Sequence, residues 1–420
     1  MSGHAPPDAT RDPSAPSPPE LVCLGESMVT FLPAHPGRLA DVPAFTRAIG
    51  GAESNVACAL AAAGHRARWV GRVGRDGFGD HLVETIAGYG VDVGAVRRDP
   101  HRPTGVYFRT ATDRAADAHE VVYYRAGSAA SAMSPTTVPY SSVADARILH
   151  LTGITAALSA DCLALMRELT APRPGRPLVS FDVNHRPGLW RRGDAADVLL
   201  GLARRADLVF VGADEAETLW GVADPSAVRA VLPEPTGLVV KAGGEGAVLF
   251  ERPSPRAGTV THISAPGADT STHVPAGGAD TATRVPAPGA DTPTRAHVPA
   301  PGADTVTHVP APRVDIVAPV GAGDAFAAGF LSGTLRGLDA RARLRHGHLM
   351  AAAALTVPGD LAFPPARHPH TTPHGAAARR PSWIDHADRL AALDEAAWGT
   401  LHLGPGWTVH PGPDQEVRTP

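Results

Sequence analysis

Residues 320–330 read Val320-Gly321-Ala322-Gly323-Asp324-Ala325-Phe326-Ala327-Ala328-Gly329-Phe330. The apolar residues after the second glycine recur at near-helical spacing, which predicts that the glycines lie at the N-terminus of a helix. Unpaired backbone N–H groups and the helix dipole make such a terminus an anion site. Asp324 would be unfavourable beside an anion unless it accepts a proton from a hydroxyl that attacks this anion. The stretch therefore predicts phosphoryl transfer, and a glycine-rich turn with an ordinary capping aspartate is the alternative.

The composition indicates a protein with a substantial hydrophobic core. Of its 420 residues 43% are hydrophobic, while 42 prolines and 44 glycines indicate long irregular segments. A net charge of −4 provides no basic surface for nucleic acid. No apolar run approaches the roughly 18 residues that a membrane span requires, and the first 20 residues do not form a secretory signal. We therefore expect a cytoplasmic protein without nucleic-acid or membrane partners.

Two residue types are rare. Cys23, Cys58 and Cys162 lie far apart in apolar runs, which favours buried thiols over disulfides or metal ligands. Lys241 is the only lysine among the 38 lysine and arginine residues. It is either a chance survivor or a point charge that is needed near phosphates.

Strands and helices alternate between residues 147 and 250, which predicts a parallel sheet with helices on both faces. Ligands of such sheets bind at the carboxyl ends of the strands. Asp182, Asn184 and Arg186 follow one of these strands, and residues 241–246 follow another. Both groups are therefore expected to line one crevice.

Two β-rich runs, at residues 105–109 and 121–125, predict a hairpin. Alternation in the second run places Tyr123 and Arg125 on one face and Tyr124 on the other. A tyrosine and an arginine on one face can bind a hydroxylated anion, although an exposed sheet face with a solvated arginine is the alternative.

A second glycine-led helix start lies at Gly50-Gly51-Ala52-Glu53-Ser54-Asn55, ahead of a helix predicted at residues 56–63. This start also suits a polar ligand. A plain junction between a loop and a helix is an equal alternative.

Three segments are expected to lie outside the packed core. Residues 1–20 are expected to form a disordered tail, and residues 364–420 a Pro- and His-rich tail with one short helix. Residues 252–313 repeat the sequence Gly-Ala-Asp-Thr four times and are expected to be a disordered insertion. Deleting residues 256–308 should then leave folding and activity intact. A core strand is predicted after the insertion, at residues 314–317.

The two glycine-led stretches carry a resemblance. Residues 50–55 and 321–329 resemble the two signature motifs of the ribokinase-like (PfkB) carbohydrate kinases, and the likeness spans residues 21–364 apart from the insertion. Residues 123–129 and 181–190, with the first signature, are most similar to the 2-keto-3-deoxygluconate kinases of that family.

The resemblance implies an α/β fold. Its kinase domain, over residues 21–363, would be a ribokinase-like, doubly wound, mostly parallel sheet with helices on both faces. A small β-sheet lid would come from about residues 27–49 and 104–125. The sequence itself does not reveal the oligomeric state, but the lid sheet often pairs with a partner in this family, so the resemblance allows a homo-oligomer through the lid.

The resemblance also implies roles for single residues. The sugar acid would be held by Gly51, Ala52, Glu53, Ser54, Asn55, Tyr107, Tyr123, Tyr124, Arg125, Arg186, Asp324 and Asp360. The ATP side would be formed by Asn184, Arg186, Lys241, Gly243, Gly244, Gly246, Gly321, Ala322 and Gly323. Asp324 would be the general base, and the backbone of Gly321, Ala322 and Gly323 would form the anion hole.

ATP and Mg²⁺ are the implied cofactors, and two positions depart from the family pattern. The Asn-x-x-Glu motif appears as Gly212-Ala213-Asp214-Glu215, which keeps Glu215 as an indirect contact to Mg²⁺. Ala318 stands where many relatives carry an aspartate that helps to bind a monovalent cation, so activation by K⁺ is doubtful.

The implied activity is transfer of the ATP γ-phosphoryl group to a terminal hydroxyl of a sugar acid, with 2-keto-3-deoxygluconate as the expected substrate. A kinase for a neutral sugar such as fructose or ribose, or for a nucleoside, is the alternative within enzymes. A non-catalytic sensor of sugar or nucleotide is the alternative of another class.

Overall fold

An eight-stranded sheet with the order β14-β13-β12-β11-β10-β9-β1-β4 forms the centre of the computed structural model, which describes residues 18–35, 37–110, 121–190, 193–252, 304–363 and 382–408. All neighbours in this sheet are parallel except β13, which runs antiparallel to β12 and β14. The predicted doubly wound, mostly parallel sheet is confirmed. Its strands are β1 (Leu21–Leu24), β4 (Ala67–Val70), β9 (Ile148–Thr152), β10 (Leu178–Asp182), β11 (Leu208–Gly212), β12 (Gly237–Lys241), β13 (Ala247–Glu251) and β14 (Thr305–Val309).

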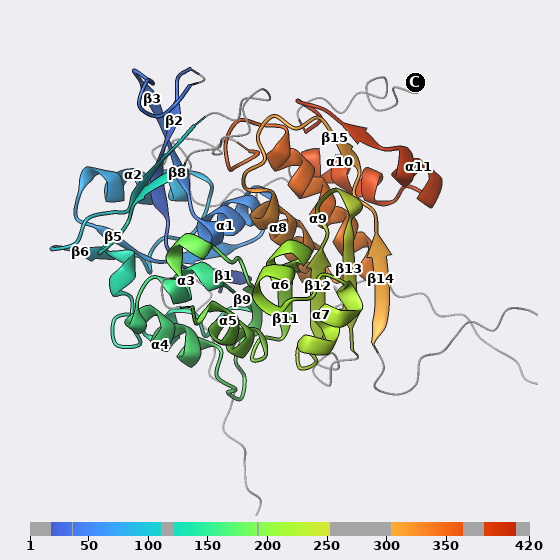
Figure 1. The fold of residues 1–420 in the computed structure, drawn as a ribbon, viewed down its shortest axis with the longest axis horizontal. Coiled ribbons are helices and arrows are strands. Elements are labelled where there is room, and N and C mark those ends of the chain that lie inside the picture. Colours follow the sequence, from blue (N-terminus) through green and yellow to red (C-terminus); the bar gives the residue numbers. More distant parts are fainter. Residues whose placement is uncertain are drawn as a thin grey trace, which may run out of the picture.

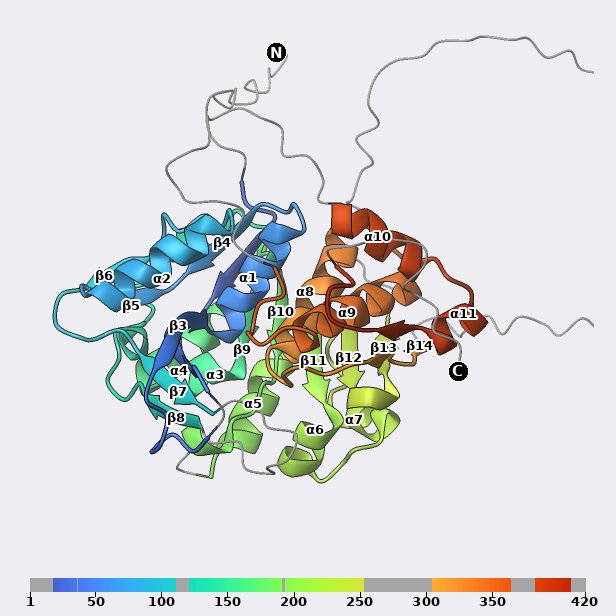
Figure 2. The same ribbon diagram turned by 90° about the horizontal axis from the view of Figure 1, so that it is seen from above.

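Helices cover both faces of this sheet (Figure 2). Side chains alternate between the faces along each strand. In β11, for example, Phe210 packs with one helix layer, while Val209 and Val211 pack with the other. The first layer contains α1 (Ala52–Ala62), α2 (Gly77–Gly88), α8 (Ala322–Leu335), α9 (Ala340–Leu355), α10 (Ser382–Ala391) and α11 (Glu395–Thr400). The second layer contains α3 (Gly153–Ala157), α4 (Ala160–Leu169), α5 (Ala195–Ala203), α6 (Ala213–Trp220) and α7 (Pro225–Val231).

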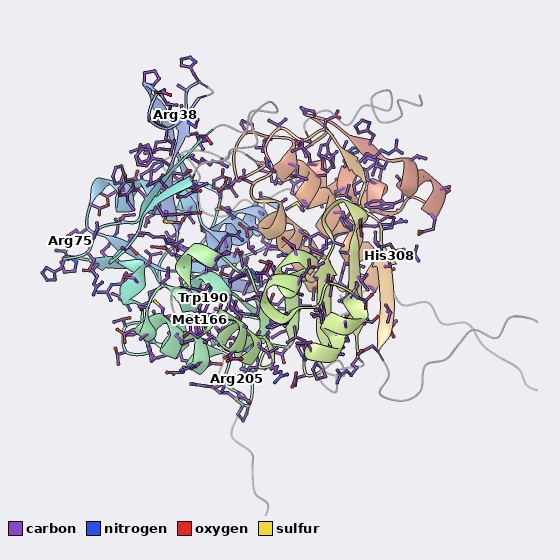
Figure 3. All side chains as sticks on the ribbon, viewed as in Figure 1. Arg38, Arg75, Met166, Trp190, Arg205 and His308 are labelled. Atoms are coloured by element: carbon purple, nitrogen blue, oxygen red, sulfur yellow. The ribbon has the colours of Figure 1, made fainter. Side chains whose placement is uncertain are left out.

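A separate four-stranded sheet, with the order β3-β2-β7-β8, projects from one side of the molecule (Figure 1). Its strands are β2 (Met28–Pro33), β3 (Phe45–Gly50), β7 (Val106–Arg109) and β8 (Val121–Tyr124). The pairing of β7 with β8 is antiparallel, so the predicted hairpin is confirmed. The rings of Phe31 and Phe108 stack at 4.7 Å, and Arg38 marks the outer tip of the sheet (Figure 3). Beside it, β5 (Arg72–Gly74) pairs with β6 (Arg97–Asp99).

The first signature enters its helix earlier than predicted. We expected the helix at residues 56–63, but α1 begins at Ala52, because the Asn55 N–H already donates to the carbonyl of Gly51 at 2.8 Å. Residues 52–55 therefore form the first turn of the helix rather than a loop before it.

The boundary predicted for the insertion, at residue 313, is wrong. Residues 305–309 form β14, which pairs with β13 at the edge of the main sheet. The strand predicted at residues 314–317 is instead β15 (Arg313–Val314), which leaves the main sheet and pairs with β16 (His402–Leu403). Deleting residues 256–308 would remove β14, so a harmless deletion has to end before it. Residues 253–303 of the insertion lie outside the described residues.

The C-terminal part also differs from its prediction. One short helix was expected, but two helices, α10 and α11, form, because Asp394 caps a new helix start by accepting the Ala397 N–H at 2.8 Å. Trp398 and Trp407 join the same buried cluster as α8 and α9. Residues 382–408 are therefore part of the packed domain, which we had expected to end at residue 363.

Three smaller expectations concern the ends of the chain, the thiols and the membrane. Residues 1–17 of the predicted tail lie outside the described residues. Cys23, Cys58 and Cys162 are buried free thiols, as predicted. Within the described residues, no helix combines the length and the apolar character that crossing a bilayer requires.

Candidate active site

A cavity of about 1170 Å³ lies between the small sheet and the carboxyl ends of β1, β9 and β10. Gly51 and Asn55 at the start of α1, Tyr107 of β7 and Arg186 after β10 line it. Residues 319–324, at the start of α8, line its other end. The cavity therefore brings both glycine-led signatures and the hairpin to one place.

The N-terminus of α8 opens into this cavity. Gly321 caps it with φ 71°, and a Cβ at this position would lie 2.5 Å from the carbonyl oxygen of Asp360. Both the left-handed backbone and the close packing therefore require glycine. Ala325 donates the first helical hydrogen bond, to the Gly321 carbonyl at 2.9 Å. The N–H groups of Ala322, Gly323 and Asp324 precede this bond and form an anion site at the helix end.

Asp324 connects the two signatures. Its Oδ2 accepts a hydrogen bond of 2.9 Å from Nδ2 of Asn55, on α1. Desolvation raises the pKa of Asp324 to about 6, and the carboxylates of Asp182 and Asp360 act in the same direction, against the Asn55 bond and the charge of Arg186. A carboxylate with this pKa is a competent proton acceptor near neutral pH.

Lys241 belongs to a buried group of charges beside the anion site. Its Nζ donates to Oδ2 of Asp182 at 3.0 Å and lies 3.7 Å from where a Cβ on Gly323 would stand. Burial alone would lower the pKa of Lys241, but the carboxylates of Asp182 and Glu215 raise it above the usual value. The sole lysine is therefore charged. Lys241 meets Asp182 at the carboxyl ends of β12 and β10, but of the two groups predicted to line one crevice only Arg186 lines this cavity.

The side chain of Glu215 holds the backbone of this region through hydrogen bonds. Its two oxygens accept the N–H groups of His185 and Gly212, each at 2.8 Å. Burial raises the pKa of Glu215, while Lys241 opposes this shift. Among the described residues, no group of three His, Cys, Asp or Glu side chains is arranged to bind a metal. The indirect contact of Glu215 to Mg²⁺ stays a prediction.

At the end of the cavity beside the small sheet, Asp360 joins two residues of β7. Its Oδ2 accepts the Tyr107 hydroxyl at 3.1 Å, and its Oδ1 lies 3.2 Å from the guanidinium of Arg109. A Cβ on Gly50 would lie 2.1 Å from the Tyr107 hydroxyl and 2.8 Å from Asp360 Oδ2. The first glycine of the signature is therefore needed for this contact to form.

A second arginine of the cavity, Arg125, is held in place by a buried glutamate. Arg125 forms an ion pair with Glu26, which is 2% exposed, and the Ser128 hydroxyl donates to the other oxygen of Glu26 at 2.6 Å. The guanidinium of Arg125 also lies over the ring of Tyr123, 5.6 Å from its centroid. Tyr123 and Arg125 therefore share one face, as predicted.

Several predicted substrate residues do not line the cavity. Glu53 is fully buried behind it, where the hydroxyls of Thr152 and Thr155 each donate to it at 2.8 Å. Ser54 is also fully buried and donates to Ser27. Tyr124 is 64% exposed and contacts Phe108 on the other face of the small sheet. The reason is geometric, since successive residues of a helix or strand point in different directions.

Several residues predicted to bind ATP also lie away from the cavity. Asn184 is 5% exposed, adopts φ 41° and donates its N–H to Asp182, so it shapes the turn after β10. A Cβ on Gly243 or Gly244, after β12, would have no neighbouring atom within 4 Å. Gly246 has φ 123°, and a Cβ there would lie 2.3 Å from the Val309 carbonyl oxygen, so it serves the packing of β14. None of these four residues lines the cavity.

Two residues of the site were not singled out from the sequence. Glu26 lies two residues after the end of the first strand, and Arg109 ends a run in which only Tyr107 was given a role. Position after a strand end was a usable signal for Glu26. The pairing of Arg109 with Asp360 joins residues about 250 positions apart, which no local pattern indicates.

The sequence of this chain matches known proteins over most of its length. A model of the pfkB family carbohydrate kinases matches residues 18–276 and 298–367. A 2-dehydro-3-deoxygluconokinase of Thermoproteus tenax is 36% identical over 55% of this chain and 71% of its own length. The enzyme of the same name from Bacillus subtilis is 31% identical over 83% of this chain and 93% of its own length.

The fold matches solved structures as well. The PfkB protein from Polaromonas sp. JS666 superposes with a TM-score of 0.62 at 30% sequence identity. The superposition covers 80% of this chain and 95% of the other.

Proposed function

Because this chain belongs to the pfkB family of carbohydrate kinases, we propose that it phosphorylates a terminal hydroxyl of a sugar acid, 2-keto-3-deoxygluconate. Family membership makes it an ATP-dependent sugar kinase. The choice of acceptor is supported by the two relatives named 2-dehydro-3-deoxygluconokinase.

The main support for a sugar acid as the acceptor is the unpaired charge of Arg186. It lines the cavity, is exposed there, and has no carboxylate within ion-pair distance in the described part of the chain. The other arginines of the cavity, Arg109 and Arg125, are already paired with Asp360 and Glu26. An unpaired guanidinium favours an anionic ligand, because it can bind a carboxylate through two hydrogen bonds. Arg186 and Arg125 would together orient the carboxylate of the acceptor.

Asp324 would act as the general base. It would accept the proton of the attacking hydroxyl while the N–H groups at the start of α8 stabilise the transferring phosphoryl group. Lys241 lies beside these N–H groups and would offset charge that develops on the phosphoryl oxygens. Asn55 would orient Asp324 through its hydrogen bond.

The negative charge around the anion site would suit a bound Mg²⁺ ion. Three carboxylates, Asp182, Glu215 and Asp324, share Lys241 there, and hard oxygen ligands are those that Mg²⁺ prefers. When bound with ATP, Mg²⁺ would neutralise phosphate charge. Ala318 is 4% exposed and offers no carboxylate, so we do not expect K⁺ to activate the enzyme through this position.

The small sheet would close over the acceptor and exclude water, which otherwise competes for the phosphoryl group. Its outer face exposes Tyr124 beside Phe108, an apolar patch that would pair with the same face of a second subunit. Size-exclusion chromatography of a Tyr124→Lys variant tests this pairing, since the charge should shift the protein to the monomer.

The test of the function is a coupled assay of ADP release over a panel of 2-keto-3-deoxygluconate, gluconate, fructose, ribose and adenosine. We expect kcat/KM for the sugar acid to exceed that for each neutral compound by at least about 100-fold, the discrimination that one charged hydrogen-bonding pair provides. A neutral sugar as the best acceptor would contradict the proposal. No turnover with any compound would favour the non-catalytic sensor.

A further inference from the structure

The outermost strand of the main sheet, β14, is anchored at its start by an ion pair between a partly buried aspartate and a buried arginine. Both oxygens of Asp304 accept hydrogen bonds from Arg229, at 2.7 and 2.8 Å, and one also accepts a bond from Arg252 at 3.1 Å. Arg229 is 7% exposed. Removing the carboxylate would leave a buried guanidinium without its counter-ion, which is strongly destabilising.

The other end of β14 is anchored by packing and by its backbone. The side chain of Val309 is 2% exposed, and its carbonyl accepts Nε2 of His348 at 3.1 Å. Burial lowers the pKa of His348 to about 4, so its ring is neutral near pH 7. The carbonyl of Pro310 accepts a hydrogen bond of 2.9 Å from Nε1 of Trp398. Asp304, Val309 and Pro310 thus hold β14 in place.

The remaining positions of the strand are less demanding. Val306 is 57% exposed and His308 is also exposed, while Thr307 is partly buried opposite Leu249 of β13. Side chains at the first two positions can therefore vary at little cost.

This strand is itself the last copy of the repeat in the insertion. Residues 302–312 read Gly-Ala-Asp-Thr-Val-Thr-His-Val-Pro-Ala-Pro. The copies at residues 267–277 and 278–288 keep the Asp, both Thr and the Val-Pro at the same spacing. Before the final Ala-Pro or Ala-Gly, the first copy differs from residues 302–310 only at Val306, where it carries Ser271. The second copy differs at Val306 and His308, both exposed, where it carries Ala282 and Arg284. Every residue that anchors β14 thus recurs in both copies.

The two other copies lack this match. The copy at residues 257–266 has Gly258 in place of the Asp and Ser264 in place of the Pro. The copy at residues 289–301 carries Pro293 and has two extra residues between its Asp and its Val-Pro. A proline removes a backbone donor, and two extra residues break the spacing between the two anchors. These copies serve as internal negative controls.

We propose that the strand position beside β13 is interchangeable, so that residues 269–275 or 280–286 of the same chain can replace residues 304–310 there. Exchange shortens the connection before the strand and lengthens the one after it. The cost of loop closure grows only slowly with length, so neither change opposes the exchange strongly. Each copy brings its own Asp for Arg229 and its own Pro carbonyl for Trp398.

The test compares Val309→Asp alone with Val309→Asp combined with Val274→Asp and Val285→Asp, in the full chain. A buried Asp should disable each copy it enters. We expect the single variant to unfold within about 3 °C of the wild type, because another copy takes the position. The triple variant should lose roughly 10 °C or its cooperative transition. Leu249→Asp, in a strand without copies, is the matched control and should be as damaging as the triple variant.

Equal losses in the single and triple variants would overturn the proposal, and so would a stable triple variant. A cysteine pair gives a direct readout. In the Val309→Asp background, Val248→Cys with Arg284→Cys or with His273→Cys should form a disulfide on oxidation in at least one variant, because residue 248 pairs with His308 in the native register. Val248→Cys with Arg295→Cys should not. A disulfide only between two chains, or stability that is lost on dilution, would assign the exchange to a second molecule and refute it within one chain.

Discussion

The two ends of the cavity treat charge in opposite ways. At the end beside the small sheet, where we propose that the sugar acid binds (the sugar end), Arg109 meets Asp360 at 3.2 Å and Arg125 meets Glu26, so each of these two arginines has its own anion. Such pairs fix side-chain positions, and their net charge is zero.

At the α8 end, Asp182, Glu215 and Asp324 share the charge of Lys241. Desolvation is the main cause that raises the pKa of Asp324 to about 6, and the charge of Asp182 acts in the same direction. The difference agrees with the proposed roles, in which one end holds the acceptor in one orientation and the other end accepts a proton. Variants at the two ends should therefore change different kinetic constants.

The largest effect should come from Asp324→Asn. The amide retains the shape and can still contact Asn55, but it cannot accept a proton, so kcat should fall by about 10²–10⁴-fold with KM for the sugar acid nearly unchanged. Steady-state ADP release measures both constants. Asp360→Asn, at the sugar end, is the control and should raise KM instead. A normal kcat in Asp324→Asn would remove the proposed base.

Next in size is Arg125→Ala. The loss of a charged hydrogen-bonding partner should reduce kcat/KM for the sugar acid by about 30–100-fold, mainly through KM, and should change the rate with a neutral sugar little. Arg125→Lys keeps the charge and should recover part of the loss. Equal losses with acidic and neutral acceptors would show that Arg125 supports the fold rather than the carboxylate.

The pH profile should separate the two ends further. Since Asp324 must be ionised to act, and its pKa is raised to about 6, kcat/KM should fall below pH 6 by about tenfold per pH unit. In the Arg125→Ala variant kcat/KM should be lower at every pH but should fall at the same acidic pH, because the sugar end does not supply the titrating group. A shift of this acidic pKa in the Arg125 variant would contradict the separation of roles between the two ends.

A smaller effect is expected from Glu26→Gln. The amide can still accept the Ser128 hydroxyl but no longer pairs with the guanidinium of Arg125, so KM should rise about 3–10-fold while kcat stays. A fall in kcat with constant KM would show that Glu26 acts on the transferring phosphoryl group.

The smallest effect is on stability, again at Asp324. A carboxyl whose folded pKa lies above its unfolded value binds more protons in the native state between about pH 4 and pH 6, so the native state loses stability as pH rises through this range. Asp324→Asn has no such loss. Its Tm should match the wild type near pH 4 and exceed it by a few degrees above pH 6, measured by thermal unfolding. An equal Tm at both pH values would contradict the raised pKa.

The parts that could be predicted from the sequence are those with strong local patterns. The alternation of strands and helices gave the parallel sheet, and the two glycine-led stretches do line one cavity. Residues 121–125 revealed through their alternation which side chains share a face.

The parts that could not be predicted depend on contacts between distant residues. β14 has a Thr-rich sequence and lies within a repeat, and its place in the sheet depends on contacts such as the ion pair between Asp304 and Arg229, which lie 75 residues apart. Glu53 belongs to a signature, yet Thr152 and Thr155 hold it behind the cavity. The direction in which a side chain points from its helix turn decides whether it reaches the cavity, and composition carries no information about that direction.

The late position of α10 and α11 in the chain has a consequence for biosynthesis. Leu390, Trp398 and Trp407 belong to the same buried cluster as Phe326 and Phe330 of α8. The layer of α4 to α7 is complete once residue 252 has left the ribosome, but the layer that carries α8 keeps an uncovered apolar surface until residue 407 has emerged. The nascent chain therefore exposes this surface longest next to α8, and there a chaperone that shields apolar segments would have most to protect.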